Sequence, residues 1–187
     1  MIPEKGLQIF LDRLEELEIP FMISGSFASN AHGVPRVTQD ADVIIDTDLS
    51  TLLRLIESLG EGFYADPDTV REAFSTTRMF NVIHQDTGFK IDIILRKHRS
   101  FSVEEFKRRC RMNFLGHPRW FSTPEDTILA KLEWSKMGQS ERQFEDALQI
   151  ARVQGETLDR SYLKKWAAEL GVEDLVNRVL SKADSTA

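Results

Sequence analysis

Apolar residues recur along the chain with two different spacings, and each spacing predicts a different kind of element. Positions that repeat every three to four residues indicate amphipathic helices that bury one face. This spacing, together with caps and turn residues, predicts helices over residues 4–17, 27–32, 49–59, 66–74, 102–109, 123–137, 140–153, 161–170 and 173–181. Thr123 precedes a proline at the first helical position, and Ser102 with Glu105 fits a capping box. The polar residues 182–187 are expected to fray.

Short apolar runs between these helices predict strands. Such runs occupy residues 21–23, 43–45, 79–85 and 89–95. The run at 89–95 is β-branched and apolar, so we expect it near the centre of a sheet. Residues 111–114 and 119–121 predict a hairpin, although Pro118 also fits a loop.

The distribution of these elements predicts the fold class. Strands mixed with helices fill residues 1–121, whereas residues 122–187 contain only helices. We therefore expect an α/β (α+β) mixed sheet flanked by helices over 1–121, followed by a helical subdomain over 122–187.

Composition narrows the class of protein. The chain has 187 residues, of which 41% are hydrophobic and 29% charged, as is ordinary for a soluble globular protein. Its one cysteine, Cys110, excludes an internal disulfide and suits a reducing cytoplasm. No apolar run is long enough for a signal peptide or a membrane span, so we expect a cytoplasmic protein without a membrane segment.

Charge is distributed unevenly along the chain. The net charge is −6, yet the segment from Arg96 to Arg119 holds eight basic and two acidic residues. A basic segment of this kind can bind a polyanion such as RNA or tRNA. It fits a solvated helix and hairpin equally well, and the sequence leaves both interpretations open.

The chemistry is concentrated in residues 21–45. Gly25 and Ser26 end an apolar run and open a short helix, whose free N–H groups favour bound phosphate. Asp40 and Asp42 lead into the next apolar run, and residues two apart on a strand face the same side. Two carboxylates on one side suit Mg²⁺, which binds oxygen and often shares phosphate ligands.

This stretch resembles the nucleotidyltransferase superfamily that includes DNA polymerase β. The matching motif is Ser24-Gly25-Ser26, a spacer over 27–39, and Asp40-Ala41-Asp42-Val43, and residues 32–38 resemble the AbiEii-type toxin branch. The resemblance implies an NTP substrate, Mg²⁺ or Mn²⁺ held by aspartates, and phosphates bound by Gly25, Ser26, Arg36 and Thr38.

The same resemblance gives a role to a carboxylate in the next strand. Asp92 interrupts the apolar run 89–95, where a lone carboxylate is costly unless it is paired or binds metal. The superfamily has its third catalytic carboxylate on such a strand, which implies that Asp92 is a metal ligand and general base. The alternative is a structural aspartate satisfied by Lys90, Arg96 or a backbone N–H.

A second stretch of resemblance lies in the helical half. The segment Thr123 to Leu132 is similar to the AbiEii-type helix that carries a lysine, and residues 142–146 resemble the Arg-Asp-x-x-Asp element that follows it, with Gln143 in place of the first Asp. This implies that Lys131 contacts the phosphates and that Asp146 orients Lys131 or a substrate. The alternative is a surface lysine and an Arg142–Asp146 pair within one helix.

Three functional hypotheses follow. The first is a metal-dependent nucleotidyltransferase that moves a nucleoside monophosphate from an NTP to a hydroxyl group. The acceptor is RNA or tRNA, a protein or a small molecule. One version of this hypothesis is a toxin–antitoxin component with a cognate toxin or antitoxin as its partner. The second is a catalytically vestigial module that binds RNA or a partner on the same fold. The third is an unrelated α/β protein, which predicts that Asp40 and Asp42 lie far from Asp92.

Overall fold

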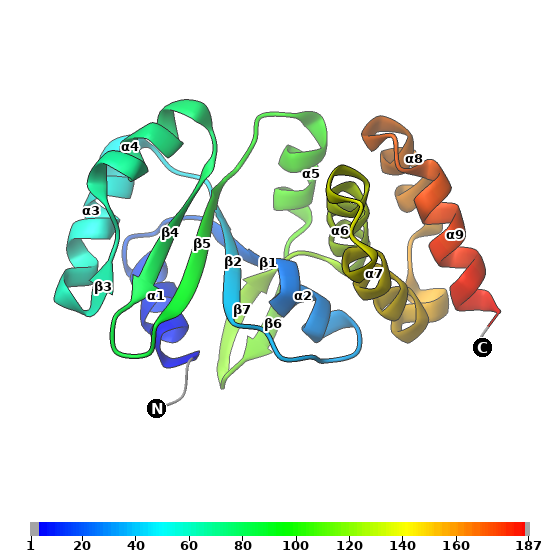
Figure 1. Ribbon diagram of the computed structural model, residues 1–187, viewed down its shortest axis with the longest axis horizontal. Helices are drawn as coiled ribbons and strands as arrows, with labels where there is room; N and C mark the ends of the chain where they lie inside the picture. Colours follow the sequence, from blue (N-terminus) through cyan, green and yellow to red (C-terminus); the bar gives the residue numbers. More distant parts are fainter. Residues whose placement is uncertain (1–3, 186–187) are drawn as a thin grey trace.

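The computed structural model describes residues 4–185, which form a seven-stranded mixed sheet with a group of helices beside it (Figure 1). Strands β2 and β5 are parallel, as are β1 and β7, and all other neighbours are antiparallel. The strand order is β3 (Phe63–Tyr64), β4 (Met79–His84), β5 (Phe89–Leu95), β2 (Asp40–Ile45), β1 (Phe21–Ser24), β7 (His117–Phe121) and β6 (Cys110–Phe114). The predicted mixed α/β sheet is confirmed, and β5 lies in its interior.

Three helices cover one face of this sheet and form its core: α1 (Glu4–Glu16), α3 (Leu49–Leu59) and α4 (Pro67–Thr76). Strand β2 alternates along its length, because Ala41, Val43 and Ile45 are buried in this core while the residues between them are half-buried. The alternation is the strand period of two. It turns Asp40 and Asp42 to the opposite face, away from α1, α3 and α4.

Helix α2 (Gly25–His32) follows β1 directly and packs against both the sheet and the C-terminal helices (Figure 1). These helices are α6 (Pro124–Gly138), α7 (Glu141–Gln154), α8 (Arg160–Leu170) and α9 (Glu173–Asp184). They enclose a second apolar core that contains Leu129, Leu132 and Leu163, and Phe101 of α5 (Ser100–Arg108) joins it. None of the helices within residues 4–185 is long and apolar enough to cross a membrane.

Two predicted helix ends are wrong. Helix α5 begins at Ser100, so Ser102 is an interior residue whose hydroxyl accepts a hydrogen bond from Arg99 Nε at 3.0 Å instead of capping the helix. Helix α9 continues to Asp184, because Ala183 is buried in the second core and Asp184 pairs with Arg160 at 2.6 Å. The predicted fraying of 182–184 is therefore wrong, and residues 186–187 lie outside the described chain.

Three small elements left no pattern in the sequence. Strand β3 has two residues, and the 3₁₀ turns Gly60–Gly62 and Gly155–Thr157 have three each. Segments this short show neither alternation nor helical spacing. The predicted hairpin, in contrast, is present as β6 and β7.

Candidate active site

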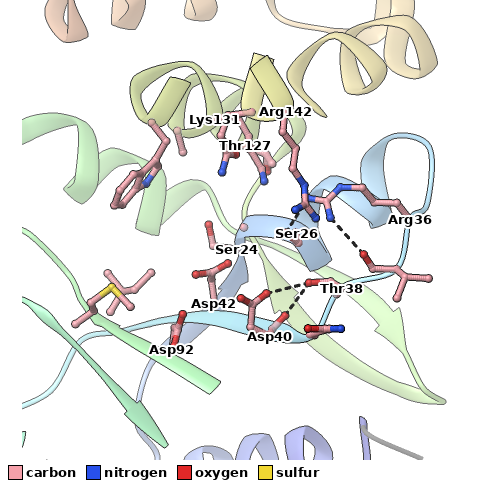
Figure 2. Close-up of a pocket in the computed structure, with 18 residues that line it drawn as sticks. Ser24, Ser26, Arg36, Thr38, Asp40, Asp42, Asp92, Thr127, Lys131 and Arg142 are labelled. Atoms are coloured by element: carbon pink, nitrogen blue, oxygen red, sulfur yellow. Dashed lines mark hydrogen bonds between the residues drawn. The ribbon is translucent and has the colours of Figure 1, made fainter. Parts of the chain in front are cut away.

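Strand register brings the three predicted carboxylates together. Asp42 is paired with Asp92 on the parallel neighbour β5 and with Ser24 on the antiparallel neighbour β1. Paired residues on adjacent strands project to the same face, and Asp40 lies two residues before Asp42 on that face. All three line one cavity (Figure 2). The hypothesis that Asp40 and Asp42 lie far from Asp92 is therefore wrong.

This cavity has a volume of about 630 Å³ and lies between the sheet and the helices α6 and α7. Figure 2 shows the three carboxylates on one side and Lys131 and Arg142 on the other. The lining residues are Ser24, Gly25, Ser26, Arg36, Val37, Thr38, Gln39, Asp40, Asp42, Met79, Asp92, Ile94, Thr127, Ala130, Lys131, Trp134, Arg142 and Gln143.

Gly25 allows the start of α2 to approach the carboxylates closely. Its φ is +56°, and a Cβ added to it would lie 1.8 Å from Asp42 Oδ2. Only a residue without a Cβ can hold this backbone position beside the carboxyl group. The first turn of α2 therefore begins beside the carboxylates, and Gly25 and Ser26 line the same cavity.

The three carboxylates repel one another. Burial and the nearby charges of Asp92 and Asp40 together raise the pKa of Asp42 to about 6, against the opposing effects of Lys131 and the Ser26 backbone N–H. A carboxyl group in this situation favours any nearby cation that relieves the repulsion.

Asp92 is buried, and only one of its oxygens is satisfied by protein. Lys90 Nζ lies 3.0 Å from Oδ2, whereas the buried Oδ1 has no hydrogen-bond partner within the described chain. Arg96, the other partner considered from the sequence, pairs with Asp46 at 2.9 Å. A structural role for Asp92 thus leaves a buried oxygen unexplained, and such atoms are costly.

The donor set suits a divalent cation that arrives with phosphate. In the described part of the chain, no three His, Cys, Asp or Glu side chains converge closely enough to enclose a metal ion by themselves. Mg²⁺ is commonly held by only one or two carboxylates plus substrate phosphates. The unpartnered Asp92 Oδ1 and the raised pKa of Asp42 fit such a shared site.

Two cationic side chains, Arg36 and Lys131, line the cavity with the carboxylates, and we call them the cationic wall. Both are held by Asp146. Lys131 Nζ lies 2.9 Å from Asp146 Oδ2, and Arg36 donates from Nε and Nη2 to the two oxygens of Asp146 at 2.9 and 2.8 Å. Arg36 Nη2 also donates to Ser26 Oγ at 3.1 Å. Although burial opposes it, these hydrogen bonds hold the pKa of Asp146 below its usual value.

These contacts decide between the alternatives for the helical half. Lys131 is 5% exposed, so the interpretation as a surface lysine is wrong. Asp146 pairs with Arg36 and Lys131. Arg142 is exposed and lines the cavity. Asp146 itself does not line the cavity, but it contacts two cations that do. Thr38 lines the cavity and donates to Asp40 Oδ1 at 3.0 Å.

Several lining residues were not predicted. Thr127, Ala130 and Trp134 share a face of α6 with Lys131, at spacings of three and four residues that could have identified them. Met79 and Ile94 come from β4 and β5, and only the strand register brings them to the cavity.

The basic segment does not contribute to this cavity, since none of its residues from 96 to 119 is among the lining ones. Ion pairs with acidic residues engage Arg96, Arg99, Arg108, Arg111 and Arg119. Arg109 packs over the rings of Phe106 and Trp120. Lys97 and Lys107 are exposed. Most of the segment thus neutralises the protein's own acidic side chains.

Comparison with known proteins identifies the fold. No family model matches the chain, and no curated protein matches it. Among solved structures, the antibiotic-resistance factor ANT(2'')-Ia has a TM-score of 0.57 at 15% identity, covering 88% of this chain and 92% of that one. The lincosamide antibiotic adenylyltransferase LnuA, with lincomycin bound, has a TM-score of 0.55 at 13% identity, covering 80% and 97%. An antigenic nucleotidyltransferase-like protein from Paracoccidioides brasiliensis has 0.57 at 15%, covering 96% and 92%. The chain therefore has the nucleotidyltransferase fold.

Proposed function

We propose that this chain is a metal-dependent nucleotidyltransferase that moves a nucleoside monophosphate from an NTP to a hydroxyl group. One observation carries the proposal: a single cavity has three aspartates from two paired strands on one side and Lys131 with Arg142 on the other. An NTP with its metal needs both, since its phosphates are anions and its cation needs oxygen ligands.

The phosphates are assigned to the start of α2 and to the cationic wall. Backbone N–H groups at Gly25 and Ser26 are suited to the terminal phosphates, as at other helix N-termini. Arg36 and Lys131 neutralise the negative charge that builds up on departing pyrophosphate. Asp146 holds both cations in place, and Thr38 steadies Asp40 through the hydrogen bond at 3.0 Å.

The carboxylates are assigned to metal binding and to proton transfer. Asp40, Asp42 and Asp92 would hold Mg²⁺ or Mn²⁺, which when bound supplies charge stabilisation at the phosphate oxygens. In the transfer step the acceptor oxygen forms a bond to the α-phosphorus as the bond to pyrophosphate breaks. Asp92, whose Oδ1 has no protein partner, takes the acceptor's proton.

A small molecule is the favoured acceptor. Two structural neighbours were solved with antibiotic compounds bound: ANT(2'')-Ia with adenylyl-2''-tobramycin and LnuA with lincomycin. RNA or tRNA bound through Arg96–Arg119 is less favoured, because five of those arginines are engaged in ion pairs. Transfer to RNA or to a protein would instead fit a toxin–antitoxin role, and the transfer assay below distinguishes these cases.

The test is transfer of label from each α-³²P-labelled NTP, with Mg²⁺ or Mn²⁺, to small hydroxyl compounds, total tRNA or lysate protein. We expect label in one small-molecule fraction, loss of it in Asp42→Asn, and retention in Asp86→Asn, which removes an exposed carboxylate from a turn. Label in tRNA or protein would replace the small molecule as acceptor. Binding of NTP without any transfer would favour the vestigial binding module.

A further inference from the structure

One side of the cavity is apolar, and the nucleotide chemistry does not account for it. Met79 and Ile94 are register partners on β4 and β5, and Ile94 lies two residues after Asp92 on the same face. Trp134 lies three residues after Lys131 on α6. We call Met79, Ile94 and Trp134 the apolar wall.

The apolar wall is exposed to an extent that core packing does not explain. Trp134 is 56% exposed and Met79 is 43% exposed, yet both line the cavity. Large apolar side chains gathered at a cavity commonly mark a ligand surface. The wall contains no charged residue, so it offers nothing to phosphate groups.

Reaction geometry relates the apolar wall to one of the two substrates. In phosphoryl-type transfer the attacking and leaving oxygens lie roughly in line on opposite sides of the phosphorus. The pyrophosphate end of the NTP is assigned to Gly25 and Ser26, and across the sheet from β1 follow Asp42, then Asp92, and then β4. The acceptor hydroxyl must therefore approach from the side of Asp92, where the apolar wall begins.

We propose that the apolar wall is the acceptor subsite, and that the acceptor carries an apolar or aromatic face next to its reactive hydroxyl. The inference rests on the proposed function and narrows its substrate class. Trp134 stacks on that face while Met79 and Ile94 support it from the sheet.

A matched pair of probes tests the proposal. Phenyl β-glucoside and methyl β-glucoside present the same sugar hydroxyls and differ in the aromatic ring. Their affinities are measured by calorimetry in the presence of Mg²⁺ and a non-hydrolysable NTP analogue. We expect the phenyl compound to bind more tightly, and Trp134→Ala to remove that advantage, roughly 5- to 150-fold as for stacking on an aromatic side chain.

Control variants separate stacking from general damage. Trp134→Phe keeps a ring and should keep most of the advantage, whereas Tyr64→Ala removes an aromatic side chain of similar exposure (59%) outside the cavity and should change nothing. Affinity for the NTP analogue should be the same in all four proteins.

The possible failures have different signatures. If the phenyl compound has no advantage, or if the advantage survives in Trp134→Ala, the acceptor subsite is wrong. If Trp134→Ala weakens the NTP analogue instead, the apolar wall binds the nucleobase and the proposal is also wrong. If the wild-type protein does not bind the NTP analogue at all, the proposed function itself fails.

Discussion

At the scale of single residues, the candidate site depends on the close approach between Gly25 and Asp42. The backbone of Gly25 has a positive φ, and its missing side chain makes room for the Asp42 carboxyl group. Two properties of one glycine are thus used together: the left-handed conformation and the absence of a Cβ.

Gly25→Ala should therefore cost more than backbone strain. Alanine at positive φ costs about 1 kcal/mol or slightly more, and here its Cβ also displaces the Asp42 carboxyl group. Gly88→Ala is the matched control, because Gly88 has a φ of +65° with nothing within 4 Å of an added Cβ. Urea unfolding should show the larger loss of stability in Gly25→Ala, and only that variant should lose NTP transfer. Equal losses in both variants would show that the contact with Asp42 is unimportant.

Asp42→Asn should stabilise the metal-free protein at high pH. Because the folded-state pKa of Asp42 is raised to about 6 from 3.8, its ionised form costs stability, by about 3 kcal/mol at pH 8. The cost is complete above pH 6 and disappears as the pH falls through 6 toward 4, so the advantage of the variant should shrink over that range. Thermal unfolding at several pH values measures it.

The same variant tests metal binding. Mg²⁺ or Mn²⁺ should raise the melting temperature of the wild-type protein, since a cation relieves the repulsion among the carboxylates. Asp42→Asn should lose most of that rise. A variant with the full metal response would show that the metal binds elsewhere.

How much of the site could be predicted depends on how far apart its residues lie along the sequence. Gly25, Ser26, Asp40 and Asp42 lie within one short stretch, so strand period and helix-start chemistry are enough to associate them. The bond between Arg36 and Asp146 joins residues 110 apart, and no local pattern encodes it. Met79 reaches the cavity only through its register with Ile94.

At the scale of elements, helix α5 illustrates what local pattern misses. Ser102 and Glu105 match the capping-box pattern in the sequence, yet both are buried residues in the interior of the helix. Tertiary packing against the C-terminal helices overrides the local signal, as Phe101 enters their core. Helices with a strong cap and a proline, such as α6, were placed correctly because the two signals agree.

Glu105 gives this helix a predicted pH dependence. Burial, together with the nearby charge of Asp126, raises its pKa to about 8. The unfolded chain loses this proton near the ordinary value of 4.5 and the folded protein near 8, so the contribution of Glu105 to stability should fall as the pH rises from 4.5 to 8.

Glu105→Gln removes this titration. Its free energy of unfolding relative to the wild type should increase by roughly a few kcal/mol between pH 5 and pH 8. Urea unfolding at both pH values measures the difference, and Glu104→Gln, at a less buried position of the same helix, serves as the control. A constant difference between Glu105→Gln and the wild type would contradict the prediction.

At the scale of the whole molecule, the candidate site lies where two apolar cores meet. The first core joins the sheet to α1, α3 and α4, and the second joins α6 to α9. The sheet provides the carboxylates of the site, and α6 provides Lys131. Helix α2 packs against both the sheet and the C-terminal helices. The predicted division of the chain at residues 121 and 122 remains a prediction, and we propose that neither part alone carries a complete site.

The fold class was predictable from the order of the elements, because strands and helices alternate before residue 121 and only helices follow. The sheet order was not, since β1 pairs with the distant β7 and β2 with β5. The charge of the basic segment was also predictable, but its role was not. The sequence gives the number of cations in the segment. Only the fold shows that Arg119 is buried, with its Nη1 atom 2.7 Å from Glu15 Oε2.

The release of pyrophosphate from an NTP tests the central claim most directly, because it requires the carboxylates, the cationic wall and the metal together. The account predicts Mg²⁺- or Mn²⁺-dependent release in the presence of a hydroxyl acceptor. Asp92→Asn should lower the rate by roughly 10²- to 10⁴-fold, as for loss of a general base, and Asp86→Asn should leave it unchanged. Release that is equally fast in Asp92→Asn, or that does not depend on a divalent metal, would contradict the account.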